Sequence, residues 1–596
     1  MSSPTNNWLT LKLTLKLISA LIFLGSMLIG CQADNNSESH QSQRASPVIY
    51  TAKEIVTMNT QQPTAEAVAI ENDRIIAVGK LAEIEQALAD RDYQIDNRFR
   101  DQVLIPGLIN QHDHPWLAAL TMSSQILAIE DWNIGGKHFP RASNQAQYRT
   151  KLAALIAQHG NNDELFFSWG YHHLWHGELS RDILDEISAD IPIMIWQRSG
   201  HELIFNTKAL AYFNFTQEWV NQFNPSAFAQ SSFERGHFWE QGAMQTIPAV
   251  FKELAKPNRF VPALEMIKNY WHAAGSTLVV EPGGLVNKGL MSMQNHVFAG
   301  EETPFHMDYI ADGKTMAYEY LDGDMIGETE RLLDWGQGMS RFIPKQVKLF
   351  ADGAIFNQLM KMKDGYLDGH HGEWIMEPEK LAKAFSIYWD ADYQIHVHQN
   401  GDEGLEVVLD IIEENMKRNP RKDHRTVIVH FGFSTKEQVQ RIAGLGVIVS
   451  ANPYYAVALT DTYSKAGIGP SRAQEMVRLA DVVDAGVSLS LHSDMPMAPG
   501  KPLFLIWSAV NRISLEGNLV GASQRLTPEQ ALKAVTLDAA YSMQMEKTLG
   551  SIEIGKLANL TVLAENPLTI DPMNIKDIKV WGTLHEGRVL PAPQLR

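Results

Sequence analysis

The stretch that decides the fold is VLIPGLINQHDH, residues 103–114, because it joins an apolar run to two imidazoles. Residues 103–109 carry no polar side chain, which is typical of a parallel strand buried on both faces. His112 and His114 follow at positions i and i+2, so at the end of a strand both side chains point to one side. Such a pair predicts a divalent metal site. The alternative is two hydrogen-bonded histidines beside a turn.

The middle of the chain, residues 105–548, alternates apolar runs with helical patterns such as those at 404–416 and 435–445. Repeated strand–helix units predict an α/β protein with a parallel sheet, and at this length a TIM-like (β/α)8 barrel. In such barrels the functional side chains lie at the carboxyl ends of the strands. The predicted strands after the first are residues 191–196, 276–280, 347–350, 393–398, 426–430, 447–450 and 487–492.

The two ends of the chain predict strands of a second, smaller domain. Residues 48–51 and 67–79 are apolar strand runs, and Asn72-Asp73 inside the second run is a hairpin signal. Residues 557–563 and 580–584 have the same character. We therefore expect residues 47–104 and 549–596 to form one small β-sandwich.

The charge balance argues against a nucleic-acid partner. The 596 residues include 51 Lys and Arg but 69 Asp and Glu, giving a net charge of −18. Phosphate backbones attract basic surfaces, and this chain has no long basic cluster. The composition does not indicate an oligomeric state.

The first 30 residues have the pattern of a lipoprotein signal peptide. Lys12 and Lys16 precede the apolar residues 17–30, which are too few for a comfortable membrane span. The stretch Leu28-Ile29-Gly30-Cys31 resembles a bacterial lipobox, and the resemblance implies cleavage before Cys31 and lipid attachment to it. The alternative is an ordinary secretory signal with a chance cysteine.

Cys31 is the only cysteine of the chain, so the folded part offers neither disulfides nor thiolate ligands. The polar residues from 31 to 46 predict a flexible tether. Gln32 follows the cysteine, and by resemblance to Gram-negative lipoproteins this implies the cell envelope, at the outer membrane and facing the periplasm. The lipid anchor would be the only link to the membrane.

Several predicted strands end in a side chain that can bind a metal. Each one alone has a simpler explanation: a hydrogen-bonded structural histidine, a surface lysine or a turn aspartate. Together they mark successive strands at the ends where a barrel gathers its functional groups. The candidate ligands are His112, His114, Lys348, His398, His430 and Asp494.

These residues and their neighbours resemble the amidohydrolase superfamily, and within it the third amidohydrolase family, which holds YtcJ-like proteins and N-substituted formamide deformylases. The resemblance spans nearly the whole chain after the tether, in the right order. It is specific for the family and weak for the substrate. It is carried by residues 105–114, 347–353, 397–402, 429–431, 492–499 and 550–560, with 169–171 and 199–202 as further landmarks.

The resemblance implies a role for each candidate ligand. His112 and His114 correspond to the metal ligands after the first strand. Lys348 corresponds to a lysine that is N-carboxylated in many relatives and bridges two ions, since a carbamate offers two anionic oxygens. The remaining positions imply that His398 and His430 bind the second ion and that Asp494 is both a ligand and the general base.

The implied reaction is hydrolysis of an amide or cyclic amide C–N bond in a small molecule. A divalent metal activates the water, and Asp494 moves its proton to the leaving nitrogen. His201 corresponds to a donor that stabilises the carbonyl oxygen or orients the substrate, but a structural histidine in a loop explains it equally well. Zinc is the expected metal, as one ion or two, because imidazole and carboxylate ligands suit it; manganese or iron fits the oxygen-rich version.

Two other functions stay open from the sequence. The same site could hydrolyse an ester, a lactone or a phosphotriester, and a lipoprotein of a different class could bind or regulate without turnover. Asn110 stands where many relatives have Asp, and His492 stands where Gly is commoner. Because these departures lie beside the predicted site, the substrate of a relative does not identify the substrate of this chain. Gly369, Gly372 and Trp374 suggest that residues 369–374 form a lid.

Overall fold

The computed structural model describes residues 46–160, 163–284 and 286–594, and an eight-stranded parallel sheet carries its largest part. Along this sheet, each strand pairs with the next of its strands in sequence order. The segments that follow the first and last strands also meet, because the Asp494 N–H donates to the His112 carbonyl at 2.9 Å. The sheet thus curls into the predicted (β/α)8 barrel. Its strands are β5 (Leu108–Asn110), β14 (Ser276–Pro282), β15 (His306–Asp312), β16 (Ser340–Phe350), β17 (Gln394–Gln399), β18 (Val427–His430), β19 (Ile448–Ala451) and β20 (Leu489–Leu491).

Helices follow the barrel strands, and their ends obey local chemistry. The run predicted at 435–445 is α16, which begins after Thr435, whose hydroxyl and Gln438 form a capping box. The run predicted at 404–416 is the centre of α15. The helices after β14 are α11 (Lys288–Phe298), α12 (Gly313–Tyr320), α13 (Met325–Arg331), α14 (Pro378–Asp390), α15 (Asp402–Arg418), α16 (Lys436–Leu445), α17 (Tyr454–Ala466), α18 (Pro470–Gln474), α19 (Leu479–Asp484), α20 (Pro502–Asn511), α21 (Pro528–Ala534) and α22 (Leu537–Ser542).

Strands from the two chain ends pair in one β-sheet. The prediction was a small β-sandwich, and the seven strands form a single sheet in the order β23-β22-β21-β4-β1-β2-β3. The long strand β4 joins the two ends, since it pairs with β1 on one side and with β21 on the other. Apolar side chains from both ends fill one core. The elements are β1 (Val48–Val56), β2 (Thr64–Glu71), β3 (Arg74–Gly79), α1 (Leu81–Ala87), β4 (Gln94–Pro106), β21 (Leu560–Leu563), β22 (Val580–His585) and β23 (Arg588–Pro591).

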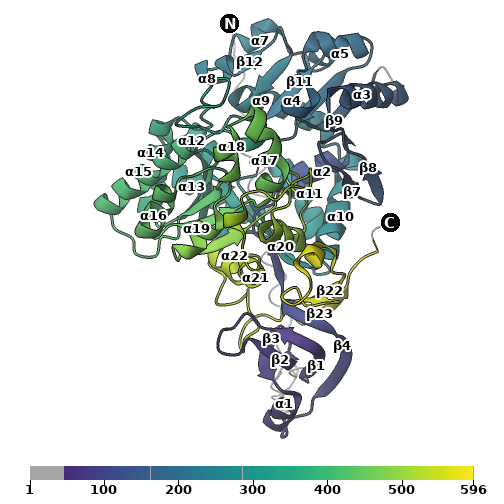
Figure 1. Cartoon of the computed structure of the whole chain (residues 1–596), viewed down its shortest axis with the longest axis vertical. Helices are drawn as coiled ribbons and strands as arrows, with labels where there is room; N and C mark the ends of the chain where they lie inside the picture. The colour runs from purple at the N-terminus through teal and green to yellow at the C-terminus, as the bar shows by residue number, and fades with distance from the viewer. Residues whose placement is uncertain (1–45, 161–162, 285, 595–596) are drawn as a thin grey trace, which may run out of the picture. The chain divides into compact units, whose positions relative to one another are not determined.

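A second sheet, which the sequence did not reveal, is inserted between barrel strands β5 and β14. Its six strands run in the order β12-β13-β11-β10-β9-β6, and Figure 1 shows α3, α4 and α5 beside it. The run at 191–196, predicted as a barrel strand, is β10 of this sheet, so that assignment was wrong. A buried parallel strand has the same apolar pattern in any sheet, because the pattern records burial and not the neighbours.

The inserted strands are β6 (Gln125–Ile126), β9 (Phe166–Tyr171), β10 (Ile193–Gln197), β11 (Glu202–Phe205), β12 (Ser231–Ser232) and β13 (His237–Trp239), with the hairpin β7 (Trp132–Ile134) and β8 (Lys137–Phe139). The helices of this region are α2 (Pro115–Met122), α3 (Gln145–His159), α4 (His173–His176), α5 (Arg181–Ile187), α6 (Thr207–Tyr212), α7 (Gln217–Val220), α8 (Pro225–Ala229), α9 (Glu240–Leu254) and α10 (Pro257–Ala273).

Barrel strand β15 was also missed. It reads HMDYIAD, so ionisable residues interrupt the apolar run that marks the other strands. Those polar groups are buried and bonded: Asp308 pairs with Arg341 at 3.1 Å, and Asp312 caps α12. Partnered polar groups can replace an apolar pattern inside a sheet.

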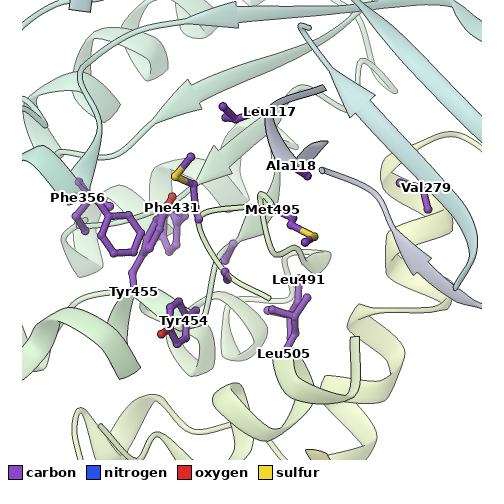
Figure 2. Close-up of a cluster of buried hydrophobic side chains, with 14 of the residues drawn as sticks. Leu117, Ala118, Val279, Phe356, Phe431, Tyr454, Tyr455, Leu491, Met495 and Leu505 are labelled. Atoms are coloured by element: carbon purple, nitrogen blue, oxygen red, sulfur yellow. The ribbon is translucent and has the colours of Figure 1, made fainter. Parts of the chain in front are cut away.

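A large apolar core lies inside and around the barrel. Figure 2 shows Tyr455, Phe356 and Phe431 close together at one end of this cluster, with Leu491 and Leu505 further along. The rings of Phe356 and Tyr455 meet edge to face at 5.5 Å. Within the described ranges, no helix is long and apolar enough to cross a membrane. The predicted signal peptide, Cys31 and almost all of the tether lie outside the described residues.

Candidate metal centre

The six predicted ligands line one cavity of about 450 Å³ at the carboxyl ends of the barrel strands. His112 and His114 follow β5, and Lys348 and His398 lie on β16 and β17. The sequence therefore placed these residues at one site, although they are spread over almost 400 positions. The set is His112, His114, Lys348, His398, His430 and Asp494.

Three of these residues, His112, His114 and Asp494, are in direct contact, and His430 lies just beyond them. Asp494 Oδ1 lies 3.3 Å from His112 Nε2 and 3.1 Å from His114 Nε2. The other carboxylate oxygen, Oδ2, lies 3.6 Å from His430 Nδ1. The His112 and His430 side chains are buried, and those of His114 and Asp494 are mostly shielded from water. His112, His114 and Asp494 form one of two groups of described residues whose atoms converge closely enough to hold an ion.

The electrostatics of this cluster follow from burial and from the carboxylates. Burial lowers the pKa of His112, and the charge of Lys348 lowers it further. Burial would also lower the pKa of His114, but Asp494 and Glu281 outweigh it and raise the pKa to about 9. Glu281 Oε1 lies 3.5 Å from His114 Nδ1 and is itself buried. A carboxylate behind a histidine ligand is the usual means of fixing its ring.

Strained backbone holds the cluster in place. His430, Phe431 and Asp494 have φ values of 77°, 53° and 56°, a left-handed conformation that is unfavourable for residues other than glycine. Asp113 supports the loop of Asp494, because its Oδ1 accepts from the Met495 N–H at 2.8 Å. Hydrogen bonds between segments far apart in the sequence thus keep the strained residues where the cavity needs them.

Asn110, which stands where many relatives have Asp, helps Asp113 to support the loop of Asp494. Its Nδ2 donates to Asp113 Oδ2 at 2.7 Å, and its Oδ1 accepts from the Ser276 hydroxyl at 2.7 Å. Trp271 Nε1 donates to the same Asp113 oxygen at 2.9 Å. An amide satisfies this position because Asp113 already supplies the negative charge.

Lys348 and His398 stand apart from the contact cluster. Burial lowers the pKa of Lys348 to about 7, although Asp494 and Asp312 oppose the shift. His398 Nε2 lies 3.1 Å from Asn400 Nδ2, and its ring lies 4.5 Å from that of His430. Among the described residues, no carboxylate forms an ion pair with Lys348. The amine therefore faces the cavity without an anionic partner.

His201 enters the cavity from the inserted sheet, and its partner Glu240 was not predicted. His201 Nδ1 lies 2.8 Å from Glu240 Oε2, and the Glu240 N–H donates to the His201 carbonyl at 2.9 Å. Burial raises the pKa of Glu240, but His201 and Asn357 outweigh it and the net shift is downward. A glutamate at the start of α9 carries no sequence signal of this role.

His492 is a second residue whose role was missed. Its ring stacks on His112 at 4.6 Å, and its Nε2 lies 3.1 Å from His430 Nδ1. Its Nδ1 lies 2.8 Å from Ser450 Oγ, which accepts from Gln111 Nε2. The Ser450 hydroxyl is thus free to donate to Nδ1, which leaves Nε2 of His492 to donate to His430. Both nitrogens of His492 have protein partners, so its position suits orienting His430.

The loop at 369–374 does not line the cavity. His370 Nε2 lies 2.6 Å from the Gln358 carbonyl, and its ring stacks on Tyr366. The inserted sheet and two helices instead supply much of the wall, through residues such as Trp196, Ser199, Met244, Pro248, Thr315 and Tyr318.

Comparison with known proteins shows the family to which this chain belongs. The model of the amidohydrolase family matches residues 100–591, which is most of the chain. The chain belongs to the amidohydrolase family. The Arabidopsis thaliana Protein LONG AFTER FAR-RED 3 is 25% identical, over 87% of each chain. N-substituted formamide deformylase of Arthrobacter pascens is 22% identical, over 89% of this chain and 96% of its own.

The fold has a solved counterpart in an uncharacterized metal-dependent hydrolase from Pyrococcus horikoshii. That structure aligns with 88% of this chain and 99% of its own, with a TM-score of 0.66 at 19% identity. Family membership and the cluster of histidine and aspartate ligands together identify this amidohydrolase as a metal-dependent hydrolase.

Proposed function

We propose that this amidohydrolase cleaves the C–N bond of an amide or cyclic amide in a small molecule. The observation that carries the proposal is the convergence of His112, His114 and Asp494 on the floor of a cavity of about 450 Å³. Cavities of this size accommodate small organic ligands. The A. pascens relative, by its name, acts on N-substituted formamides, which are also amides.

The donor set fits a divalent cation. Imidazole and carboxylate ligands suit zinc, and Glu281 Oε1 lies 3.5 Å from His114 Nδ1, which leaves His114 Nε2, 3.1 Å from Asp494 Oδ1, for an ion. His112, His114 and Asp494 would hold one ion, and His398 and His430 a second. A bound ion would supply a lowered pKa for the attacking water and polarisation of the substrate carbonyl.

Carboxylation of Lys348 would complete the second position. The amine is buried, and Asp494 and Asp312 are close enough to act on it electrostatically. An ammonium group repels a cation, whereas a carbamate adds two anionic oxygens between the two ligand sets. We therefore propose that CO2 adds to the neutral amine, which releases a proton to solvent, and that the resulting carbamate would supply anionic oxygens to both ligand sets.

Asp494 would manage the proton of the reaction. Its carboxylate is held by contacts to two imidazoles and by the strained backbone at its own position. It accepts a proton from the attacking water and delivers it to the leaving nitrogen, which cannot depart as an amide anion.

His201 would bind the substrate carbonyl oxygen or orient the amide. Its Nδ1 faces Glu240 at 2.8 Å, so Nε2 is the nitrogen left for the cavity. The Glu240 carboxylate can only accept, so it favours a hydrogen on His201 Nδ1. A donor aimed at a developing oxyanion lowers the barrier substantially.

A substrate panel tests the proposed reaction. The purified protein, loaded with zinc in bicarbonate buffer, is assayed on N-acyl and N-formyl amines, hydantoins, and the esters and lactones that match them. The proposal expects turnover of the C–N substrates above that of the matched esters. Cleavage of esters or lactones alone would replace it by the second hydrolytic function. Metal binding without any turnover would support a binding protein.

We also propose that the protein is a lipoprotein of a Gram-negative cell envelope, anchored through Cys31 at the outer membrane and facing the periplasm. The support is the sequence pattern around residues 12–32 alone. Mass spectrometry of the protein expressed in a Gram-negative host tests it. The expected amino-terminal residue is lipid-modified Cys31, and Cys31→Ala should abolish the modification. An unmodified chain cleaved elsewhere would refute the anchor.

A further inference from the structure

One more cation lines the cavity. Among the described lining residues, Lys314 and Lys348 are the only lysines or arginines. Lys314 is the second residue of α12 and is partly buried. Its Nζ lies 4.9 Å from the centre of the Phe350 ring, which places the ammonium group on the cavity wall. The proposed chemistry gives this charge no task.

Within the described ranges, the Lys314 ammonium group has no anionic partner, because it forms no ion pair with a carboxylate. Asp312 is near enough for its charge to matter, but its carboxylate accepts from the N–H groups of Lys314 and Thr315 and from the Thr315 hydroxyl. A partly desolvated charge without a partner costs free energy, and an anion brought by a ligand would offset that cost.

Lys314 lies beside the metal ligands. The Phe350 ring that it covers is 5.4 Å from Lys348 Nζ and 5.5 Å from the His398 ring. A substrate whose amide lies at the metal position would therefore bring a group only a few bonds away within reach of Lys314. Glu319, the other charged residue of α12 in the wall, is exposed, so water screens its charge.

Part of the wall is apolar, beside polar residues such as Gln241, Gln245 and Thr315. Aromatic and aliphatic side chains surround the space in front of the ligands, and they favour a substrate with a hydrophobic group of similar size. These residues are Trp116, Leu117, Trp196, Met244, Ile247 and Phe356.

We propose that Lys314 binds a carboxylate of the substrate, so that the preferred substrates are amides with a carboxylate a few bonds from the scissile carbonyl and an apolar group nearby. N-acyl derivatives of apolar amino acids have this composition. The inference rests on the proposed function, since it presumes that the cavity binds an amide. Lys314 would be a specificity residue and would take no part in the bond cleavage.

Matched substrates test the role of Lys314. N-acetylphenylalanine, as both enantiomers, and N-acetylphenethylamine share the acyl group and the ring and differ by the carboxylate. For the zinc-loaded protein we expect kcat/KM for the acid to be at least ~10-fold higher. Lys314→Met should lower that value by roughly 10- to 100-fold, mainly through KM, and change the neutral amide by no more than about 2-fold. Lys314→Arg should restore most of the loss.

Lys383→Met is the matched control, because Lys383 is exposed, pairs with Asp322 and lies away from the cavity. An equal loss on both substrates would make Lys314 a structural residue and overturn the inference. So would a wild-type protein that cleaves neutral amides of the panel but not the acid. If the metal-loaded protein cleaves no C–N substrate at all, the proposed function itself fails, and the inference fails with it.

Discussion

The two sides of the cavity floor are built differently. On the contact side, formed by His112, His114 and Asp494, the Nε2 atoms of both histidines lie within 3.3 Å of Asp494 Oδ1. On the open side, formed by Lys348 and His398, the amine has no anionic partner among the described residues. The contact side could take an ion with little rearrangement. The open side needs a further anionic group.

The difference has a structural origin. The contact side joins the ends of the first and last barrel strands, and the hydrogen bond from Asp494 N–H to the His112 carbonyl fixes them together. The open side lies on β16 and β17, where Asp352 accepts from the N–H groups of Asn400 and Gly401, but no side chain of the described residues joins Lys348 to His398. Hydrogen bonds hold the backbone on both sides, so the two sides differ in the chemistry of their side chains.

The largest expected effect comes from the contact side. Asp494→Asn should reduce kcat on the best C–N substrate by roughly 10³-fold, because the amide can neither accept the water's proton nor carry the ligand charge. Asp484→Asn, at the exposed end of α19, is the control. Steady-state kinetics on the zinc-loaded proteins measure both. A variant with more than a tenth of the wild-type activity would show that the contact side does not perform the chemistry.

A second prediction concerns the cavity wall at His201 and the partner of that residue, Glu240. Glu240→Gln should lower kcat by roughly 10- to 100-fold, because His201 loses a charged hydrogen-bond partner. Glu202→Gln is a closely matched control: Glu202 is also buried and also lies 2.8 Å from a histidine, His237, but neither residue lines the cavity. Equal losses in the two variants would mean that the His201–Glu240 pair acts only through stability.

A smaller effect should follow from the residue behind the contact side. His492→Gln should weaken zinc affinity by roughly 10-fold, since His430 loses the partner that fixes its ring. The exposed His296→Gln serves as the control. Competition with a zinc chelator measures the affinity of each protein. Unchanged zinc affinity would mean that residues other than His492 orient the His430 ring.

The last prediction tests stability rather than activity, through the pH dependence of Asp352 beside the open side. Burial raises the pKa of Asp352 from its ordinary 3.8 to about 7, so the folded chain binds a proton that the unfolded chain releases. Its contribution to the free energy of unfolding therefore falls as pH rises from about 4 to about 7, at most by about 1.4 kcal/mol per pH unit, and then levels off. Asp352→Asn should remove this slope in urea unfolding of the metal-free proteins. Parallel plots of the free energy of unfolding against pH for the two proteins would contradict this prediction.

The sequence was sufficient for the parts of the site that depend on strand ends. An apolar run followed by His, Lys or Asp indicates both a barrel strand and its functional end, and this located His112, Lys348, His398 and Asp494 together. Strand β15 escaped because its buried polar groups, which are bonded to partners outside the strand, break the apolar pattern.

The residues that were missed act through tertiary contacts. Glu240 reaches His201 from the start of an inserted helix, and His492 acts through its neighbours Ser450 and His430. The inserted sheet has the same local pattern as the barrel, so no local signal separates them. Such roles depend on which elements pack together, and spacing along one chain does not encode that.

Metal content per chain, measured by elemental mass spectrometry on the wild-type protein and on Lys348→Ala, tests the central claim most directly. Both proteins are incubated with zinc and bicarbonate and then freed of loose metal. The account predicts about two ions in the wild type and the loss of at least one in Lys348→Ala, because the open side depends on the carbamate. A wild-type protein that retains no tightly bound metal, or a variant that retains both ions, would contradict it.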